Sequence, residues 1–276
     1  MYNGLGIVKL DKNSKLLWKY AEGSHHHLSV QDDGRILVLT REDMTAPRIS
    51  SAVDILADSV TTLDAEGNEL GRMPLLDAFW NSDYASWLKA PAVSLRSQRI
   101  DLFHSNRIVV LDGRLADRIP SFRKGNLLIS LRSLNALVVV DRDSEEVVWS
   151  ASGPWLQQHC PSVLDNGNIL LFDNQGHYGA SRVLEFDPAT RAIEWRYDGG
   201  GEDELYSERF GTAQRLPNGN TLIAESHYGR ALEVTPEGEI VWEFYTPARA
   251  GDDDELIANL FEIERLPRDF PVDWLE

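Results

Sequence analysis

The stretch that decides the fold is HCPSVLDNGNILLF, residues 159–172. It predicts a hairpin, because two short runs rich in apolar and β-branched residues flank a turn at Asn166-Gly167. The pattern returns at residues 26–39 and 211–223, and a looser copy covers 104–111 and resumes at 125–129. A hairpin that recurs along one chain predicts a repeat architecture.

Each hairpin is followed by two more apolar segments, and in three places along the repeat, as in the pair of segments near the start of the chain, the second segment carries a tryptophan. Trp149, Trp195 and Trp242 share this place in their units, and Trp18 has it near the start of the chain. Four strands per unit, repeating every roughly 40–50 residues, predict a β-propeller. The units fall at residues 24–72, 103–150, 158–198 and 210–246. A two-sheet sandwich or barrel with similar hairpins is the alternative, but the recurring tryptophan favours packing between blades.

The two ends of the chain predict how the repeat closes. Residues 259–267 have the pattern of a first strand, whereas the chain begins with strands of the third and fourth type. We expect these N- and C-terminal strands to complete one blade, which leaves no open sheet edge and gives five blades. Residues 73–102 are predicted to be an inserted loop with a short helix near 75–89, although they could instead hide a sixth blade. The expected fold is therefore all-β, a single propeller domain over residues 1–276.

The composition of the chain excludes several classes of binding partner and site. The formal net charge of −17 argues against nucleic acid or an anionic membrane surface as a partner, because phosphate binding needs clustered Lys and Arg. The single cysteine, Cys160, excludes an intrachain disulfide and a multi-cysteine metal site. The sequence has neither an apolar run that could span a bilayer nor the pattern of a signal peptide. We expect a cytosolic protein, or one from which a targeting segment has been removed.

Polar residues recur at fixed distances from the turn glycines. His26 and His159 each lie eight residues before their glycine, where the third hairpin has Gly211. Seven residues after the glycine come Arg41, Arg132 and Asn174. The two places are near neighbours at the open end of an antiparallel hairpin.

First strands line the channel of a propeller, so we expect His26, His104 and His159 to converge at one channel mouth. The second strand of each hairpin, one strand further from the channel, is expected to carry Arg41, Arg132 and Asn174. Gly211 is expected to leave room for a ligand. Asn106, two residues after His104, is expected on the same side of its strand. Arg41 could also pair with an acid nearby in sequence, Glu42 or Asp43.

The ordered set of residues resembles the bacterial arylsulfate sulfotransferases. The likeness runs from about residue 24 to 267 and includes the early His26-His27 pair and the turn motifs at 165–174 and 214–223, which other propellers share. Its more specific part is the ordered set His104-Ser105-Asn106, Ser130-Leu131-Arg132 and Gln158-His159. The resemblance implies an enzyme that needs no cofactor and moves a sulfuryl group from an aryl sulfate to a phenol through a sulfohistidine. It also implies a periplasmic or exported protein if an N-terminal segment is missing.

The resemblance also implies roles for individual residues. His159 takes the place of the nucleophile, and a neutral imidazole is a competent nucleophile near pH 7. His104, Asn106 and Arg132 take places that hold the sulfuryl oxygens, where such donors stabilise developing charge. His26 or His27 takes a further supporting place, and a second histidine could protonate the leaving phenolate.

Two other functions fit the same residues. Three converging histidines could bind zinc or another borderline cation. A propeller without catalytic activity could instead bind a protein or a glycan on a rim. The tryptophans outside the regular strands, Trp80, Trp87 and Trp155, could stack a substrate ring, but packing within loops explains them at least as well.

Overall fold

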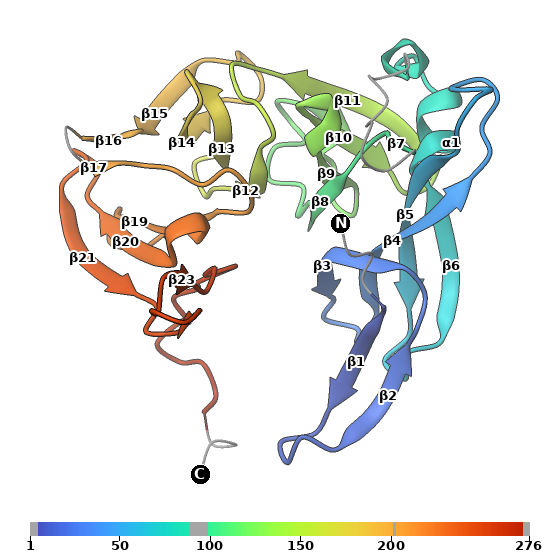
Figure 1. Cartoon of the computed structure of the whole chain (residues 1–276). Helices are drawn as coiled ribbons and strands as arrows, with labels where there is room; N and C mark the ends of the chain where they lie inside the picture. Colours follow the sequence, from blue (N-terminus) through green and yellow to red (C-terminus); the bar gives the residue numbers. More distant parts are fainter. Residues whose placement is uncertain (1–4, 89–98, 201–202, 273–276) are drawn as a thin grey trace. The chain divides into compact units, whose positions relative to one another are not determined.

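The structure is a computed structural model that describes residues 5–88, 99–200 and 203–272 (Figure 1). The chain divides into two compact units, one of residues 1–151 with 271–276 and one of residues 152–270. Apart from one short α-helix and four single-turn 3₁₀ helices, the regular structure of the described residues is β. The prediction of an all-β fold is confirmed, and the single-domain organisation stays a prediction.

The first unit contains two of the predicted four-stranded antiparallel sheets. One has the order β3 (Ser24–Val30), β4 (Ile36–Met44), β5 (Ile55–Leu63) and β6 (Glu69–Pro74), and the two-residue β7 (Ile100–Asp101) pairs in parallel with β5. The other consists of β8 (Ser105–Val110), β9 (Leu127–Leu131), β10 (Ala136–Asp141) and β11 (Glu146–Ser152). A two-stranded sheet of β1 (Ile7–Leu10) and β2 (Leu16–Tyr20) precedes them.

The second unit contains the other two four-stranded sheets. The first consists of β12 (His159–Val163), β13 (Ile169–His177), β14 (Ala180–Phe186) and β15 (Ile193–Tyr197). The second consists of β18 (Thr212–Arg215), β19 (Thr221–Glu225), β20 (Arg230–Val234) and β21 (Ile240–Tyr245). Two short pairs follow these sheets, β16 (Gly199–Gly200) with β17 (Asp203–Glu204), and β22 (Arg249–Ala250) with β23 (Leu256–Ile257). The four large sheets match the four predicted repeat units.

The turn glycines that located the repeat have the conformation that the hairpins require. Gly34, Gly167 and Gly219 have φ of 83°, 87° and 89°, in the left-handed region that glycine adopts without steric cost. Each of their N–H groups donates to the carbonyl three residues earlier, at 2.9 Å. The three turns are therefore equivalent, and they set the register of each first strand on its second.

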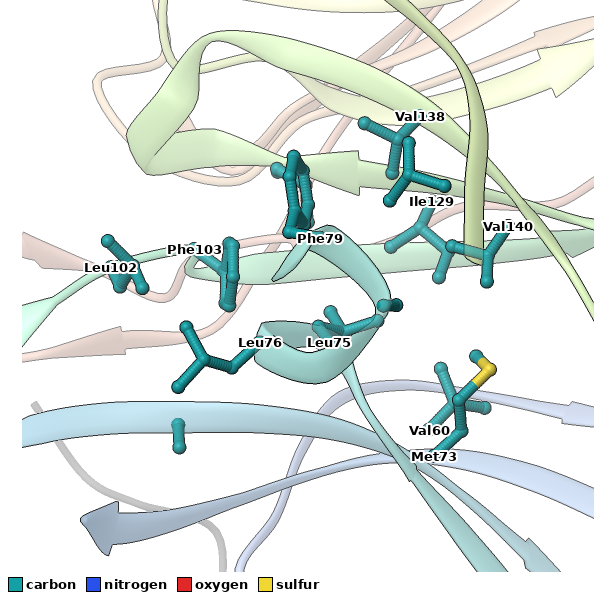
Figure 2. Close-up of a cluster of buried hydrophobic side chains, with 14 of the residues drawn as sticks. Val60, Met73, Leu75, Leu76, Phe79, Leu102, Phe103, Ile129, Val138 and Val140 are labelled. Atoms are coloured by element: carbon teal, nitrogen blue, oxygen red, sulfur yellow. The ribbon is translucent and has the colours of Figure 1, made fainter. Parts of the chain in front are cut away.

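The core of the first unit is built around the predicted helix, α1 (Leu75–Trp80). Figure 2 shows Leu75, Leu76 and Phe79 between side chains of β5 and β6 and those of β9 and β10. Phe79 stacks on Phe103 with ring centroids 5.3 Å apart, and Trp80 packs against the same cluster. A 3₁₀ turn, η1 (Ala85–Trp87), follows the helix. The helix prediction is confirmed, the described part of the insertion forms no sixth four-stranded unit, and residues 89–98 lie outside the described residues.

The recurring tryptophan joins consecutive sheets. Trp18 Nε1 donates to the carbonyl of Ala65 at 3.0 Å, and Trp195 Nε1 donates to the carbonyl of Pro236 at 2.7 Å. Both acceptors lie in the turn between the third and fourth strands of the next sheet. The predicted packing role is therefore confirmed for these two residues.

The segment 259–267 forms no strand, so that part of the prediction is wrong. The side chain of Gln214, not a neighbouring strand, binds both the N–H and the C=O of Arg265, at 2.8 and 3.2 Å. The segment nevertheless lies where a first strand is expected. Arg265 reaches Glu233 at 3.2 Å, just as Arg215 at the end of β18 reaches Glu185 at 2.7 Å.

Candidate active site

His159 and Asn174 lie together at the open end of the β12–β13 hairpin. His159 pairs in register with Phe172, two residues before Asn174. His159 Nδ1 lies 2.7 Å from Asn174 Oδ1, and both residues are buried. The spacing from the turn glycine therefore correctly predicted this pair.

The surroundings of Asn174 fix the protonation of the imidazole. Asn174 Nδ2 donates to the carbonyls of Ser207 and Phe210 at 2.8 and 2.6 Å, so Oδ1 must face the histidine. An amide oxygen can only accept a hydrogen bond, and His159 Nδ1 therefore carries the proton. In the neutral ring the lone pair is then on Nε2, which is the nitrogen able to attack an electrophile.

The expectation that Gly211 leaves room for a ligand is wrong, because the ring of Phe172 fills the space beside it. A Cβ atom built there would lie 2.6 Å from the ring of Phe172, and the φ of Gly211 is 110°. The glycine instead lets the backbone pass over the Phe172 ring, which belongs to the residue paired with His159. Its role is to support the histidine.

Two more predicted histidines meet in the first unit. The rings of His26 and His104 lie 4.8 Å apart in an edge-on arrangement. Both residues have left-handed backbones, with φ of 53° and 48°, which is uncommon outside glycine and concentrates at functional sites. His104 Nδ1 lies 2.5 Å from Asp101 Oδ2, a partner that the sequence did not predict.

Arg41 is buried between two carboxylates. Its Nε donates to Asp58 Oδ1 at 2.7 Å, and one terminal nitrogen lies 3.1 Å from Asp101 Oδ1. The expected pairing with Glu42 or Asp43 is wrong, because antiparallel register places Asp58 opposite Arg41. Ser105 gives Asp58 two further hydrogen bonds at 2.7 Å, from its N–H and its hydroxyl. Burial acts to raise the pKa of Asp58, but Arg41 and these donors hold that pKa below its usual value.

His25 completes this cluster, although no feature of the sequence distinguished it from the two histidines that follow it. Its Nδ1 lies 2.8 Å from His26 Nδ1, and its Nε2 lies 3.7 Å from Asp58 Oδ1. Burial lowers the pKa of His25 to about 4, and this effect outweighs the attraction of Asp58 for a charged ring.

The other predicted residues of the first unit have distinct surroundings. His27 Nδ1 accepts the N–H of Ile108 at 3.4 Å and so links β3 to β8; burial, with Arg107 nearby, lowers the pKa of His27 to about 3. Asn106 is buried at a shift in the β8–β9 register, so alternation along the strand does not fix its side. The N–H of Arg132 donates to the carbonyl of His104 at 3.2 Å.

The first unit thus brings together Arg41, Asp101, His26 and His104, and the second brings together His159 and Asn174. The convergence of the two sets stays a prediction. Over residues 5–88, 99–200 and 203–272, no three or more His, Cys, Asp or Glu side chains are grouped to hold a metal ion. No described helix is long and apolar enough to cross a membrane.

With this geometry established, comparison with known proteins identifies the family. The family model described as Arylsulfotransferase (ASST) matches residues 2–247. The chain belongs to this family. Membership supports an arylsulfotransferase-like function in general, and it confirms the resemblance carried by the histidine, asparagine and arginine motifs. No curated protein matches the chain.

Solved structures with similar folds have little sequence in common with this chain. A protein of unknown function from Bacteroides caccae has 14% identity and a TM-score of 0.56, over 87% of this chain and 74% of that one. Virginiamycin B lyase from Staphylococcus aureus has 12% identity and a TM-score of 0.45, over 86% and 64%. The Dos1 propeller has 10% identity and a TM-score of 0.49, over 92% and 55%. The chain therefore spans less than two thirds of the last two proteins.

Proposed function

We propose that the chain transfers a sulfuryl group from an aryl sulfate to a phenol through a sulfohistidine at His159. The observation that supports this most directly is the orientation of the imidazole by Asn174. A histidine nucleophile must present a lone pair at a defined place, and Asn174 keeps the proton on the opposite nitrogen. Family membership independently supports the reaction class.

The first step forms one bond and breaks one. His159 Nε2 attacks the sulfur with its lone pair, and the bond from sulfur to the aryl oxygen breaks with its electrons on the oxygen. Asn174 Oδ1 cannot take up the Nδ1 proton, so the sulfated ring keeps it and carries a positive charge. The neutral imidazole is a good leaving group from this cationic intermediate, so transfer to the acceptor phenol reverses the first step. The proton that the acceptor loses neutralises the phenolate released in the first step.

Residues of the first unit supply the remaining roles in this proposal. His104, Asn106 and Arg132 hold the sulfuryl oxygens, as the family resemblance implies, and His26 supports them. We propose that the chain forms a five-bladed propeller. No step of the reaction requires a cofactor.

The intact mass of the protein after brief exposure to 4-nitrophenyl sulfate tests the proposal. We expect the mass to rise by one sulfuryl group, together with release of nitrophenol, and both signals to disappear in His159→Ala. His227→Ala is the matched control, because His227 is an exposed histidine of the same unit. A wild-type protein that neither gains mass nor releases nitrophenol would contradict the proposal, and so would an adduct that persists in His159→Ala.

A further inference from the structure

The two histidines central to the proposed function have different partners. His159 Nδ1 bonds to the neutral amide of Asn174, whereas His104 Nδ1 bonds to the carboxylate of Asp101 at 2.5 Å. A carboxylate compensates the positive charge of an imidazolium, and an amide does not. The partners therefore suit one ring to donate an electron pair and the other to donate a proton.

We infer that Asp101 is the positioning residue that makes His104 the acid of the sulfuryl transfer. The inference rests on the proposed function, but it directs the Nε2 proton of His104 to the leaving aryl oxygen, so that Asn106 and Arg132 hold the sulfuryl oxygens. It also gives Asp101 a role that the sequence did not predict. Asp101 Oδ2 accepts the Nδ1 proton of His104, so the proton that the imidazolium can give away is the one on Nε2.

Asp101 is itself held in place. Its Oδ1 forms an ion pair with Arg41, whose terminal nitrogen lies 3.1 Å away, while its Oδ2 faces His104. Arg41 is anchored on Asp58, and Asp58 binds the N–H and hydroxyl of Ser105, the residue that follows His104. These contacts run from Asp101 through Arg41 and Asp58 to Ser105, the neighbour of His104. They therefore hold both the carboxylate of Asp101 and the backbone beside His104 in place.

The proposed step balances in atoms and charge. As the bond from sulfur to the aryl oxygen breaks, His104 Nε2 gives its proton to that oxygen, and the donor leaves as a neutral phenol. His104 becomes neutral and keeps its Nδ1 proton, which stays hydrogen-bonded to Asp101. The acceptor phenol then loses its proton to His104 Nε2 in the second half of the reaction, which restores the imidazolium.

A series of leaving groups tests the role of Asp101. Phenolate is a strong base that needs a proton to leave, since a phenol such as tyrosine has a pKa of about 10, whereas 4-nitrophenolate leaves readily without one. We expect Asp101→Asn to lower kcat/KM about 100-fold for phenyl sulfate and less than about 5-fold for 4-nitrophenyl sulfate. Asp101→Glu keeps the carboxylate and should recover part of the loss. Asp43→Asn, which removes an exposed carboxylate paired with Arg99, should change neither value.

Equal losses on both substrates, or no loss on either, would overturn the inference while the sulfohistidine at His159 stands. Persistence of the adduct in His159→Ala would instead overturn the proposed function. A measurement without substrate decides the geometry separately: at a pH at which the imidazole is neutral, ¹⁵N NMR should show the His104 proton on Nδ1 in the wild type and distributed over both nitrogens in Asp101→Ala, which removes the acceptor. A wild-type ring protonated on Nε2 alone, or a variant with an unchanged spectrum, would refute the role of Asp101.

Discussion

Mild acid should destabilise the first unit, because two of its histidines are buried in a form that resists protonation. Burial lowers the pKa of His25 to about 4 and that of His27 to about 3, from an ordinary value of 6.5. In the unfolded chain both rings would take up a proton near pH 6.5. The unfolded state therefore binds more protons than the folded state from about pH 6.5 down to pH 4, and stability falls as the pH falls.

The size of the effect follows from these pKa values. One unit of pKa difference corresponds to about 1.4 kcal/mol, and between pH 7 and pH 5 the unfolded state gains most of one proton per ring. Each histidine therefore costs the folded state about 2 kcal/mol over this interval, and the pair costs about 4 kcal/mol. That loss is a large part of the stability of an ordinary domain.

Urea unfolding at pH 7 and pH 5, compared between the wild type and His27→Asn, measures the contribution of one ring. The asparagine Oδ1 can replace Nδ1 as the acceptor for the N–H of Ile108, so stability at pH 7 should change little. The loss between pH 7 and pH 5 should shrink by about 2 kcal/mol. His227→Asn, which removes an exposed histidine, should leave the loss unchanged. A pH dependence identical in His27→Asn and wild type would refute the reasoning.

Two further predictions concern the surroundings of His159. Asn174→Ala removes the acceptor that orients the ring and should slow formation of the sulfated enzyme about 100-fold in a rapid-quench assay; a rate within about 3-fold of wild type would show that Asn174 does not orient the nucleophile. Gly211→Ala places a Cβ 2.6 Å from the Phe172 ring and should lower the unfolding free energy in urea by about 2–4 kcal/mol. Gly179→Ala is its matched control, with a φ of 92° and open space around the Cβ, and a loss no smaller than that of Gly211→Ala would show that the Phe172 contact is unimportant.

The fold was predictable to the extent that short-range signals determine it. Each Asp-Gly or Asn-Gly turn fixes its own hairpin, and a tryptophan marks the fourth strand of three of the four large sheets, so the sheets could be located within a few residues. Residues 259–267 have the same local signals but form no strand, because a strand also requires a partner for its backbone. Gln214 binds the backbone of Arg265 instead, through a side-chain contact between residues 51 positions apart.

The site was predictable where spacing from the turn glycine brings two side chains to the open end of one hairpin. The pair of His159 and Asn174 follows from this spacing, although the register of β12 on β13 shifts between His159 and Ser162. The meeting of His26 and His104 in the first unit was predicted, but their partners His25, Asp58 and Asp101 were missed. The left-handed backbones of His26 and His104 interrupt the regular alternation of side chains, and Asp101 reaches His104 from the parallel strand β7, which follows the insertion. Register would have identified Asp58 opposite Arg41, but only once the ends of the strands were known.

One contact between an arginine and a carboxylate recurs in three of the sheets but is arranged differently in the first. This difference explains how the first sheet orients a second histidine, His104. A buried pair of an arginine and a carboxylate crosses from the second to the third strand in three of the sheets, as Arg41–Asp58, Asp173–Arg182 and Glu225–Arg230. In each pair the carboxylate also accepts a backbone N–H from the segment that enters a first strand, which anchors that segment.

Only the first sheet has the arginine on the second strand and the carboxylate on the third. The reversal places the guanidinium of Arg41 within 3.1 Å of Asp101, so that it holds a second carboxylate as well as its own partner. The contact that elsewhere anchors the chain here also orients His104. A small change in a structural repeat therefore accounts for the second carboxylate, Asp101, that is held beside His104 in the first unit.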